Sequence, residues 1–184
     1  MSFLKRFAKW MSKNYPDVPV NMSEWTHMQG GRDKGMDSAL VTANVMYEDL
    51  SVLNVISWQH WIAVSEVNYC DGLIYINLDD KTFEMTKRYY VTGNFSKYVP
   101  AGSVRVDAAC DDSELRLLAF KYDGGCAVIV INSTEKEKEL SLSEQYSAVK
   151  SAVTDDNNDL REYDIADPGH IKITPRSVTT IILR

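Results

Sequence analysis

The pattern of hydrophobic residues changes near residue 100, and this change limits the folds open to the chain. Before it, apolar runs at helical spacing alternate with shorter apolar runs of strand length. After it, short apolar runs are separated by turn-forming groups such as Asp123-Gly124-Gly125. The first pattern is typical of parallel strands joined by crossover helices, and the second of an antiparallel β-sandwich. We therefore predict an α/β segment over 1–99 and a β-sandwich over 100–184.

The α/β segment is expected to contain three helices. The first begins at Phe3 and is stopped by Asn14-Tyr15-Pro16. The second covers 39–50, with Asp37-Ser38 as its N-cap, and the third covers 83–99 and ends at Pro100. On the third helix the expected buried side consists of Met85, Tyr89, Tyr90 and Phe95.

Strands are expected between these helices and throughout the second segment. In the first segment they are 18–25 and 53–61, followed by a short extended piece over 73–77. In the second segment seven short strands are expected, over 104–108, 115–122, 126–132, 137–142, 148–153, 170–174 and 178–183.

Composition and charge exclude several function classes. The 184-residue chain is 45% hydrophobic and carries a net charge of −6, which argues against nucleic-acid binding because no basic stripe neutralises phosphates. No apolar run is long enough to span a membrane, and the amphipathic N-terminus lacks a signal-peptide core. The three cysteines show no metal-ligand spacing, so neither a metal nor a cofactor is expected. Cys110 and Cys126 lie in neighbouring predicted strands, either bonded or as free thiols.

The strand at 18–25 ends in residues suited to chemistry. Its last positions, Glu24 and Trp25, are followed closely by His27. Parallel strands of α/β enzymes present catalytic side chains at their carboxyl ends, which makes Glu24 a candidate. The alternative is a solvated glutamate that pairs with Arg32 or Lys34 on the surface.

Two phrases carry a family resemblance. Ile56–Val64 (ISWQHWIAV) resembles the eighth barrel strand of family-30 glycoside hydrolases, and Tyr89–Val106 resembles the last barrel helix of that family and its exit into the sandwich. Met22–Trp25 is then similar to the seventh strand, where the family keeps its nucleophilic glutamate, and Pro175–Ile181 is similar to the closing strand.

The resemblance implies a C-terminal part of a retaining β-glycoside hydrolase that acts on β-linked oligo- or polysaccharides. The fold would be the last two strands and helices of a (β/α)8 barrel, followed by an antiparallel β-sandwich. The family places its general acid/base in an Asn-Glu pair on the fourth strand, and this sequence contains no such dipeptide. We therefore expect the chain to be inactive alone. Family members are commonly secreted, and the location of this chain stays open.

Site roles follow from the same resemblance. Glu24 would be the nucleophile. Trp58 and Trp61 lie at i and i+3 of one strand and should face opposite sides, so we assign Trp58 to the sugar-binding floor and place Trp61 and Trp25 at the rim. His27 and His60 would bind sugar hydroxyls or tune the nucleophile, or else be hydrogen-bonded residues without a catalytic role.

A second hypothesis is an accessory carbohydrate-binding or structural sandwich without catalysis. Its support is weak, because the aromatic residues of the second segment do not cluster in sequence as a binding platform; they include Phe120, Tyr122, Tyr146 and Tyr163. Under the first hypothesis, two parallel strands without neighbours leave exposed barrel edges. We therefore expect self-association through those edges.

Overall fold

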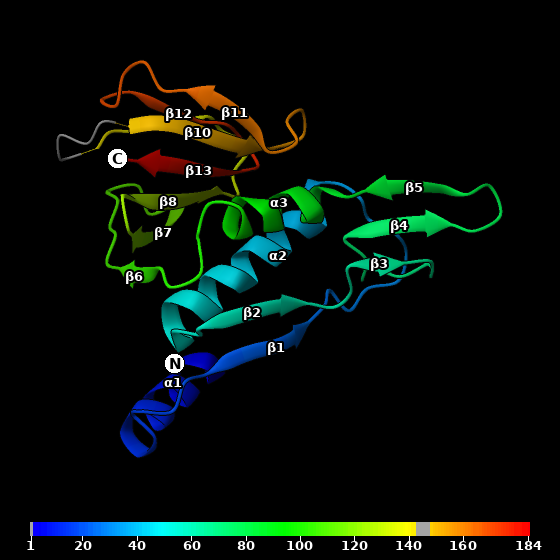
Figure 1. Ribbon diagram of the computed structural model, residues 1–184, viewed down its shortest axis with the longest axis horizontal. Helices are drawn as coiled ribbons and strands as arrows, with labels where there is room; N and C mark the ends of the chain where they lie inside the picture. The colour runs from blue at the N-terminus through cyan, green and yellow to red at the C-terminus, as the bar shows by residue number, and fades with distance from the viewer. Residues whose placement is uncertain (1, 143–147) are drawn as a thin grey trace.

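The computed structural model describes residues 2–142 and 148–184, and its centre is a six-stranded antiparallel sheet (Figure 1). The strand order is β11–β10–β13–β8–β7–β6. The bounds are β6 Val104–Val106, β7 Leu115–Tyr122, β8 Gly125–Asn132, β10 Ala148–Thr154, β11 Arg161–Asp164 and β13 Ser177–Leu183. A two-stranded sheet of β9 (Lys138–Leu140) and β12 (Ile171–Ile173) lies against one face. The predicted antiparallel sandwich is confirmed.

The other face of the large sheet is covered by two helices, α2 (Met36–Glu48) and α3 (Lys87–Ser96). Strand alternation explains how one sheet supports two cores. In β8, Ile129 and Ile131 pack toward the helices, whereas Val128 and Val130 pack toward β9 and β12. The helix-side core thus joins residues from both sides of position 100, and the division into domains 1–99 and 100–184 stays a prediction.

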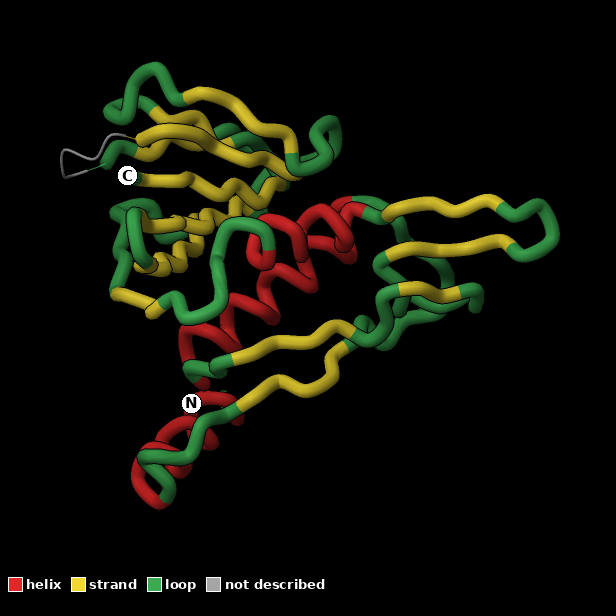
Figure 2. The backbone as a smooth tube through the Cα atoms, in the orientation of Figure 1, coloured by secondary structure: helices red, strands yellow, loops and turns green. Residues whose placement is uncertain are grey.

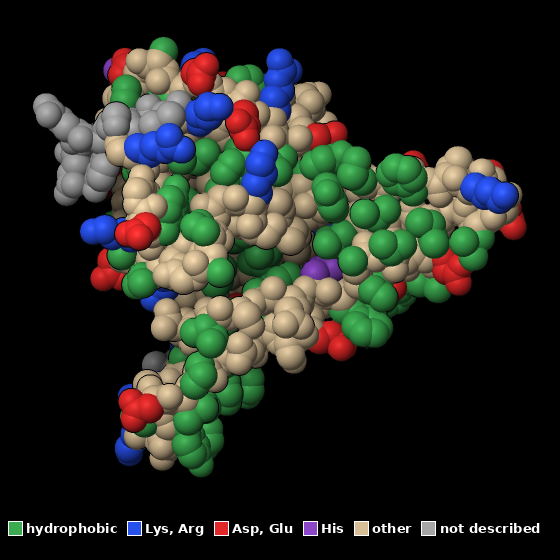
Figure 3. Space-filling model, in the orientation of Figure 1, with side chains coloured by type: hydrophobic (Ala, Val, Ile, Leu, Met, Phe, Trp, Pro, Cys, Tyr) green, Lys and Arg blue, Asp and Glu red, His purple; other side chains and the backbone are tan. Residues whose placement is uncertain are grey.

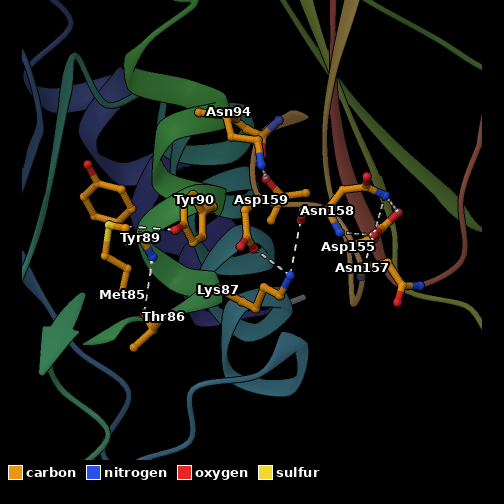
Figure 4. Close-up of polar contacts among 12 residues, drawn as sticks. Met85, Thr86, Lys87, Tyr89, Tyr90, Asn94, Asp155, Asn157, Asn158 and Asp159 are labelled. Atoms are coloured by element: carbon orange, nitrogen blue, oxygen red, sulfur yellow. Dashed lines mark hydrogen bonds and ion pairs between the residues drawn. The ribbon is translucent and has the colours of Figure 1, made fainter. Parts of the chain in front are cut away.

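Polar contacts fix α3 against the sheet (Figure 4). The fully buried Asn94 donates to the Ala152 carbonyl at 2.9 Å and accepts from the Thr154 hydroxyl at 2.6 Å. At the start of the helix, Lys87 forms an ion pair with Asp159 at 2.7 Å. Since buried polar groups are costly unless paired, these bonds favour one orientation of the helix on the sandwich.

A separate parallel pair is formed by β1 (Asn21–Trp25) and β2 (Ser57–His60). Helix α1 (Phe3–Asn14) precedes it, and α2 continues into a π-helical turn, η1 (Asp49–Leu53). Figure 1 shows α2 between this pair and the large sheet. The parallel direction agrees with the predicted crossover connection.

A projecting arm follows β2, as Figure 2 shows. It contains β3 (Val64–Ser65), β4 (Ile74–Asn77) and β5 (Thr82–Met85), with β5 antiparallel to β4. The prediction of a helix over 83–99 was therefore wrong at both ends. Its predicted buried side was also wrong in part, because Met85 and Tyr89 are exposed whereas Arg88, Val91, Asn94 and Phe95 are buried.

Three other boundaries differ from expectation. The second helix begins at Met36, because the Asp33 carboxylate accepts the backbone N–H groups of Gly35 and Ser38. The second strand begins at Ser57 instead of residue 53, because η1 extends the helical segment and Asn54 then adopts a left-handed conformation with φ of 53°. Strand β11 was not predicted.

The remaining expectations concern cysteines and aromatic residues. Cys110 and Cys126 are free thiols, both half-buried. Tyr146 lies outside the described residues. No helix in the described part of the chain is long and apolar enough to cross a membrane.

Candidate active site

The parallel pair has one covered face and one open face. Met22 pairs with Trp58 and Trp25 pairs with His60, so β1 has one residue more than β2 between these two pairs. Paired residues share a face of a sheet. Trp58 and His60 face the helices, where Met46 and Phe95 line the same recess. Met22 and Trp25 therefore face the helices as well.

Glu24 lies in the irregular part of β1, and its side chain is exposed together with that of Ser23. The carboxylate has no hydrogen bond or ion pair within the described part of the chain. Both surface partners suggested by the sequence are engaged elsewhere: Lys34 pairs with Glu84 at 2.7 Å, and Arg32 donates to the carbonyl of Val67 at 2.9 Å. A surface ion pair therefore does not explain the position of Glu24.

Trp58 and Trp61 lie on opposite faces. However, Trp58, which we expected to face the sugar, lies on the face that the helices cover. Trp58 packs against the helix-side core, and its indole N–H donates to the Asp49 carboxylate at 2.9 Å. Trp61 is 48% exposed and follows β2 directly, with its backbone N–H donating to the carbonyl of Trp25 at 2.8 Å. Since Trp61 follows His60 by one residue, alternation directs it to the open face.

Four of the predicted residues form an aromatic cluster on the covered face. The Trp25 ring lies 5.7 Å from Trp58, 6.1 Å from His60 and 6.5 Å from His27, measured between ring centroids. Such spacing is typical of stabilising aromatic contacts. The structure thus brings Trp25, His27, Trp58 and His60 together, and leaves Glu24 and Trp61 on the open side.

His60 connects this cluster to the loop that follows β2. Its Nε2 lies 2.8 Å from the carbonyl oxygen of Asp71. Burial lowers the pKa of His60 below its ordinary value, although the bond to Asp71 opposes the shift. A neutral imidazole must donate from Nε2 to bind a carbonyl, so His60 holds the loop in place through this N–H.

A buried arginine, which sequence reasoning missed, supports the same loop. Arg88 is fully buried and donates to the carbonyls of Asp33 at 2.6 Å and Gly72 at 2.7 Å, and to the thiol of Cys70 at 3.2 Å. It also donates to the hydroxyls of Ser38 and Tyr75. Its spacing in the sequence could have indicated that it is buried. Arg88 precedes Val91 by three residues and Phe95 by seven, which places it on the buried stripe of α3.

The recess next to the aromatic cluster does not include Glu24. A cavity of about 610 Å³ lies on the helix side of β2, lined by Trp58, His60, Phe95 and Arg105 among others. The open face with Glu24 is solvent-exposed instead of enclosed. Within residues 2–142 and 148–184, no three His, Cys, Asp or Glu side chains are grouped as a metal site. The residues that this geometry leaves accessible are the Glu24 carboxylate and the Trp61 indole.

Comparisons with known proteins agree with the sequence resemblance. Residues 20–75 match the family described as "O-Glycosyl hydrolase family 30", and residues 102–181 match the "Glycosyl hydrolase family 30 beta sandwich domain". The lysosomal acid glucosylceramidase of Mus musculus is 28% identical over 126 residues, which is 62% of this chain and 23% of that protein.

Solved structures share the fold. A conserved exported protein from Bacteroides fragilis superposes with a TM-score of 0.84 at 20% identity, over 97% of this chain and 42% of that one. The catalytic domain of GH30 xylanase C from Talaromyces cellulolyticus gives 0.80 at 19% identity, over 91% and 41%. The chain thus spans less than half the length of these relatives. It belongs to glycoside hydrolase family 30 and corresponds to the C-terminal portion of its members.

Proposed function

We propose that this chain carries the nucleophile of a retaining β-glycosidase, and that Glu24 is that nucleophile. One observation carries the proposal: Glu24 is an exposed carboxylate without a partner among the described residues, near the carboxyl end of a parallel strand, in a family of glycosidases. In the same proposal, β1, α2, β2 and α3 form the last two units of a (β/α)8 barrel, and the open face of β1–β2 is its interior.

The reaction needs two carboxyl groups about 5–5.5 Å apart. The carboxylate of Glu24 would attack the anomeric carbon, forming a C–O bond while the glycosidic bond breaks, and a second carboxyl would protonate the departing oxygen. The nearby loop offers Glu66 and Asp71, and Asp71 is only 8% exposed, which prevents it from reaching a leaving group. Because the sequence also lacks the Asn-Glu pair that would supply the family's general acid/base, we propose that the chain alone does not hydrolyse glycosides.

We assign the sugar-facing aromatic role to Trp61 instead of Trp58. A pyranose needs an accessible ring against which to pack its C–H face, and Trp61 lies on the open side with Glu24. Trp58 instead supports the strand from behind, together with Trp25 and His60. His27 is close to the Cys70 thiol, with Nδ1 3.7 Å from the sulfur, and supports the loop after β2.

Labelling tests the nucleophile without the missing acid. An activated 2-deoxy-2-fluoro aryl glycoside has a leaving group that departs without protonation, so a competent carboxylate traps the sugar as an ester. We expect gluco-, galacto- or xylo-configured reagents to modify the chain at Glu24, as detected by peptide mass spectrometry, and Glu24→Gln to remove the label. Glu66→Gln is the matched control and should label like the wild type. Labelling that persists in Glu24→Gln would refute the assignment.

Turnover tests the claim of incompleteness. Neither the chain nor Glu24→Gln should hydrolyse ordinary aryl β-glycosides or β-glycans at an enzymatic rate. Robust turnover that disappears in Glu24→Gln would show that the chain is complete as an enzyme, while leaving the nucleophile assignment intact.

The edges of β1 and β2 that do not face each other lack strand partners in the described part of the chain. Unpaired edges favour pairing with another chain, and we propose that copies associate through them. Sedimentation that shows only a compact monomer would contradict this.

A further inference from the structure

Arg88 contacts three segments of the chain that are far apart in the sequence. It is fully buried at the start of α3, and its guanidinium donates to the Asp33 carbonyl in the loop after β1. It also donates to the Gly72 carbonyl in the loop after β2 and to the Tyr75 hydroxyl in β4. None of these partners is a carboxylate. Because a buried cation is costly unless it is hydrogen-bonded, Arg88 favours the one arrangement in which all three segments reach it.

The bonds of the guanidinium to the loop after β2 lie on either side of Asp71. One guanidinium nitrogen lies 3.2 Å from the Cys70 sulfur, and the other lies 2.7 Å from the Gly72 carbonyl oxygen. The Asp71 carbonyl between them accepts two further hydrogen bonds, from Nε2 of His60 at 2.8 Å and from the backbone N–H of Ile62 at 2.9 Å. The guanidinium thus fixes the carbonyl group that these two residues contact.

Trp61 lies at the end of this network. Both of its neighbours in the sequence are bonded to the same carbonyl oxygen of Asp71. Its own backbone N–H donates to the carbonyl of Trp25 at 2.8 Å, and Trp25 follows Glu24 directly. The backbone that carries the proposed sugar-facing ring is therefore held on both sides, and its place relative to the strand of Glu24 is fixed by the same bonds.

The loops after β1 and β2 are also bonded to each other. The backbone N–H of Cys70 donates to the Gln29 carbonyl at 2.8 Å, and that of Gly31 donates to the Asn68 carbonyl at 3.2 Å. On the face shown in Figure 3, the arm that follows carries mostly hydrophobic side chains, and the bonds that attach it to α3 lie beneath this face. Arg88 therefore holds both loops and the base of the arm from inside the molecule.

We propose that Arg88 is a positioning residue of the glycosidase site, which orients the Trp61 indole relative to Glu24 without touching the sugar. The inference rests on the proposed function, because it takes Trp61 as the ring that packs on the substrate. Small displacements of a binding group weaken a site strongly, so a buried group that fixes such a ring controls sugar binding. Arg88, Cys70 and Tyr75 are fully buried, so the network consists of contacts within the chain.

The kinetics of labelling by the activated 2-deoxy-2-fluoro aryl glycoside separate positioning from a merely structural role. Arg88→Lys keeps the charge, but a single ammonium does not replace the planar fork of donors. We expect KI, the reagent concentration that gives half the maximal labelling rate, to rise at least about tenfold, with a smaller change in the maximal rate. Asn94→Ala removes another buried polar group from the same helix. As the matched control it should lower stability and leave KI unchanged.

A second comparison tests whether Arg88 acts through Trp61. In a Trp61→Ala background, Arg88→Lys should raise KI no further, because residues that act as one unit are not additive. Acrylamide quenching of the Trp61 fluorescence, obtained as the difference between each protein and its Trp61→Phe counterpart, needs no reagent. We expect Arg88→Lys to increase this quenching and Asn94→Ala to leave it as in the wild type.

Gly72→Ala disturbs the same network without changing Arg88. A Cβ at this position would lie 2.9 Å from the Ser65 Cβ and 3.0 Å from the Ile74 carbonyl oxygen, so the Gly72 carbonyl must shift. This variant should also increase the quenching of Trp61. Circular dichroism identifies a variant that fails to fold, and if Arg88→Lys does so, Gly72→Ala decides.

The possible results separate this inference from the proposed function. A wild type that is not labelled at Glu24 contradicts the proposed function, and the quenching of Trp61 then decides the role of Arg88. The inference is overturned if the folded variants at Arg88 and Gly72 leave this quenching unchanged, or if Asn94→Ala changes it equally. It is also overturned if Arg88→Lys raises KI as much in the Trp61→Ala background as in the wild type.

Discussion

The six-stranded sheet and the parallel pair β1–β2 are both β-structure, but they are stabilised differently. The large sheet is covered on both faces, by helices on one and by β9 and β12 on the other. The parallel pair is covered on one face only. Ile129 of β8 is fully buried, whereas Ile56, next to β2, is 67% exposed. The difference shows that buried apolar surface is concentrated in the large sheet, whereas one face of the parallel pair is open to solvent within the described residues.

The largest expected effect compares these two isoleucines. Ile129→Ala should lower the free energy of unfolding by about 2–5 kcal/mol, because it removes buried methyl groups and leaves a cavity. Ile56→Ala should change it by less than about 0.5 kcal/mol. Urea denaturation followed by tryptophan fluorescence measures both. Equal losses would mean that Ile56 is buried in solution, and would contradict the difference in exposure between these two positions.

A smaller effect concerns the junction between the helices and the sheet. Asn94→Ala removes an amide that bonds Ala152 and Thr154 and leaves those buried groups unpaired, so we expect a loss of about 1–3 kcal/mol. Asn77→Ala, at an exposed position on the arm, is the matched control. A loss no larger than that of the control would show that α3 is held on the sandwich by apolar contacts alone.

The smallest effect belongs to Asp49, which lies under Trp58. Burial raises the pKa of this carboxyl above its ordinary value, and the nearby Glu48 charge adds to the shift, while the Trp58 indole N–H opposes it. A raised pKa in the folded state means that the carboxylate destabilises the fold once it ionises, so stability should fall as pH rises through the raised pKa.

Asp49→Asn keeps an acceptor for Trp58 and removes the charge. We expect its urea midpoint to exceed that of the wild type at neutral pH, and to approach it below the ordinary pKa of an aspartate, about 3.9. The midpoints of both proteins between acid and neutral pH provide the measurement. A variant that is less stable than the wild type at neutral pH would show that the charged Trp58–Asp49 bond is net stabilising.

The sequence predicted the sandwich well because burial on both faces leaves long apolar runs. β8 and β13 are almost entirely buried, so most of their residues are apolar or small, and the buried Asn132 at the end of β8 is hydrogen-bonded. β11 was missed for the opposite reason. All four of its residues are exposed at the edge of the sheet, and its position depends on pairing with β10, not on its own hydrophobic pattern.

The helix over 83–99 was predicted wrongly because competing local signals are close together. The Thr86 side chain accepts the Tyr89 backbone N–H and starts α3, while Phe83 and Met85 pair with β4. Apolar spacing alone does not separate a strand that ends at Met85 from the first turn of a helix.

The sequence predicted which residues lie at the candidate site better than it predicted how they are oriented. The spacing of Trp58 and Trp61 shows that they face opposite sides, but it does not show which side is covered. The covered side is set by tertiary packing: α2 and α3 cover one face of the pair, and Asp49 accepts the Trp58 indole N–H there. The hydrophobic pattern of the strand does not contain this information. Arg88 was missed because charged residues are rarely expected to be fully buried.

The extra residue in β1 has a consequence for every side chain after it. If β1 were regular, with its sequence unchanged, Glu24 would share the orientation of Met22 and point into the hydrophobic wall beside the helices, while Trp25 would emerge into water. The acid and the indole would exchange surroundings without any substitution. The surroundings of the Glu24 carboxylate thus depend on a mismatch in length between two neighbouring backbone segments, and counting alternate residues along the strand would assign this carboxylate to the wrong side.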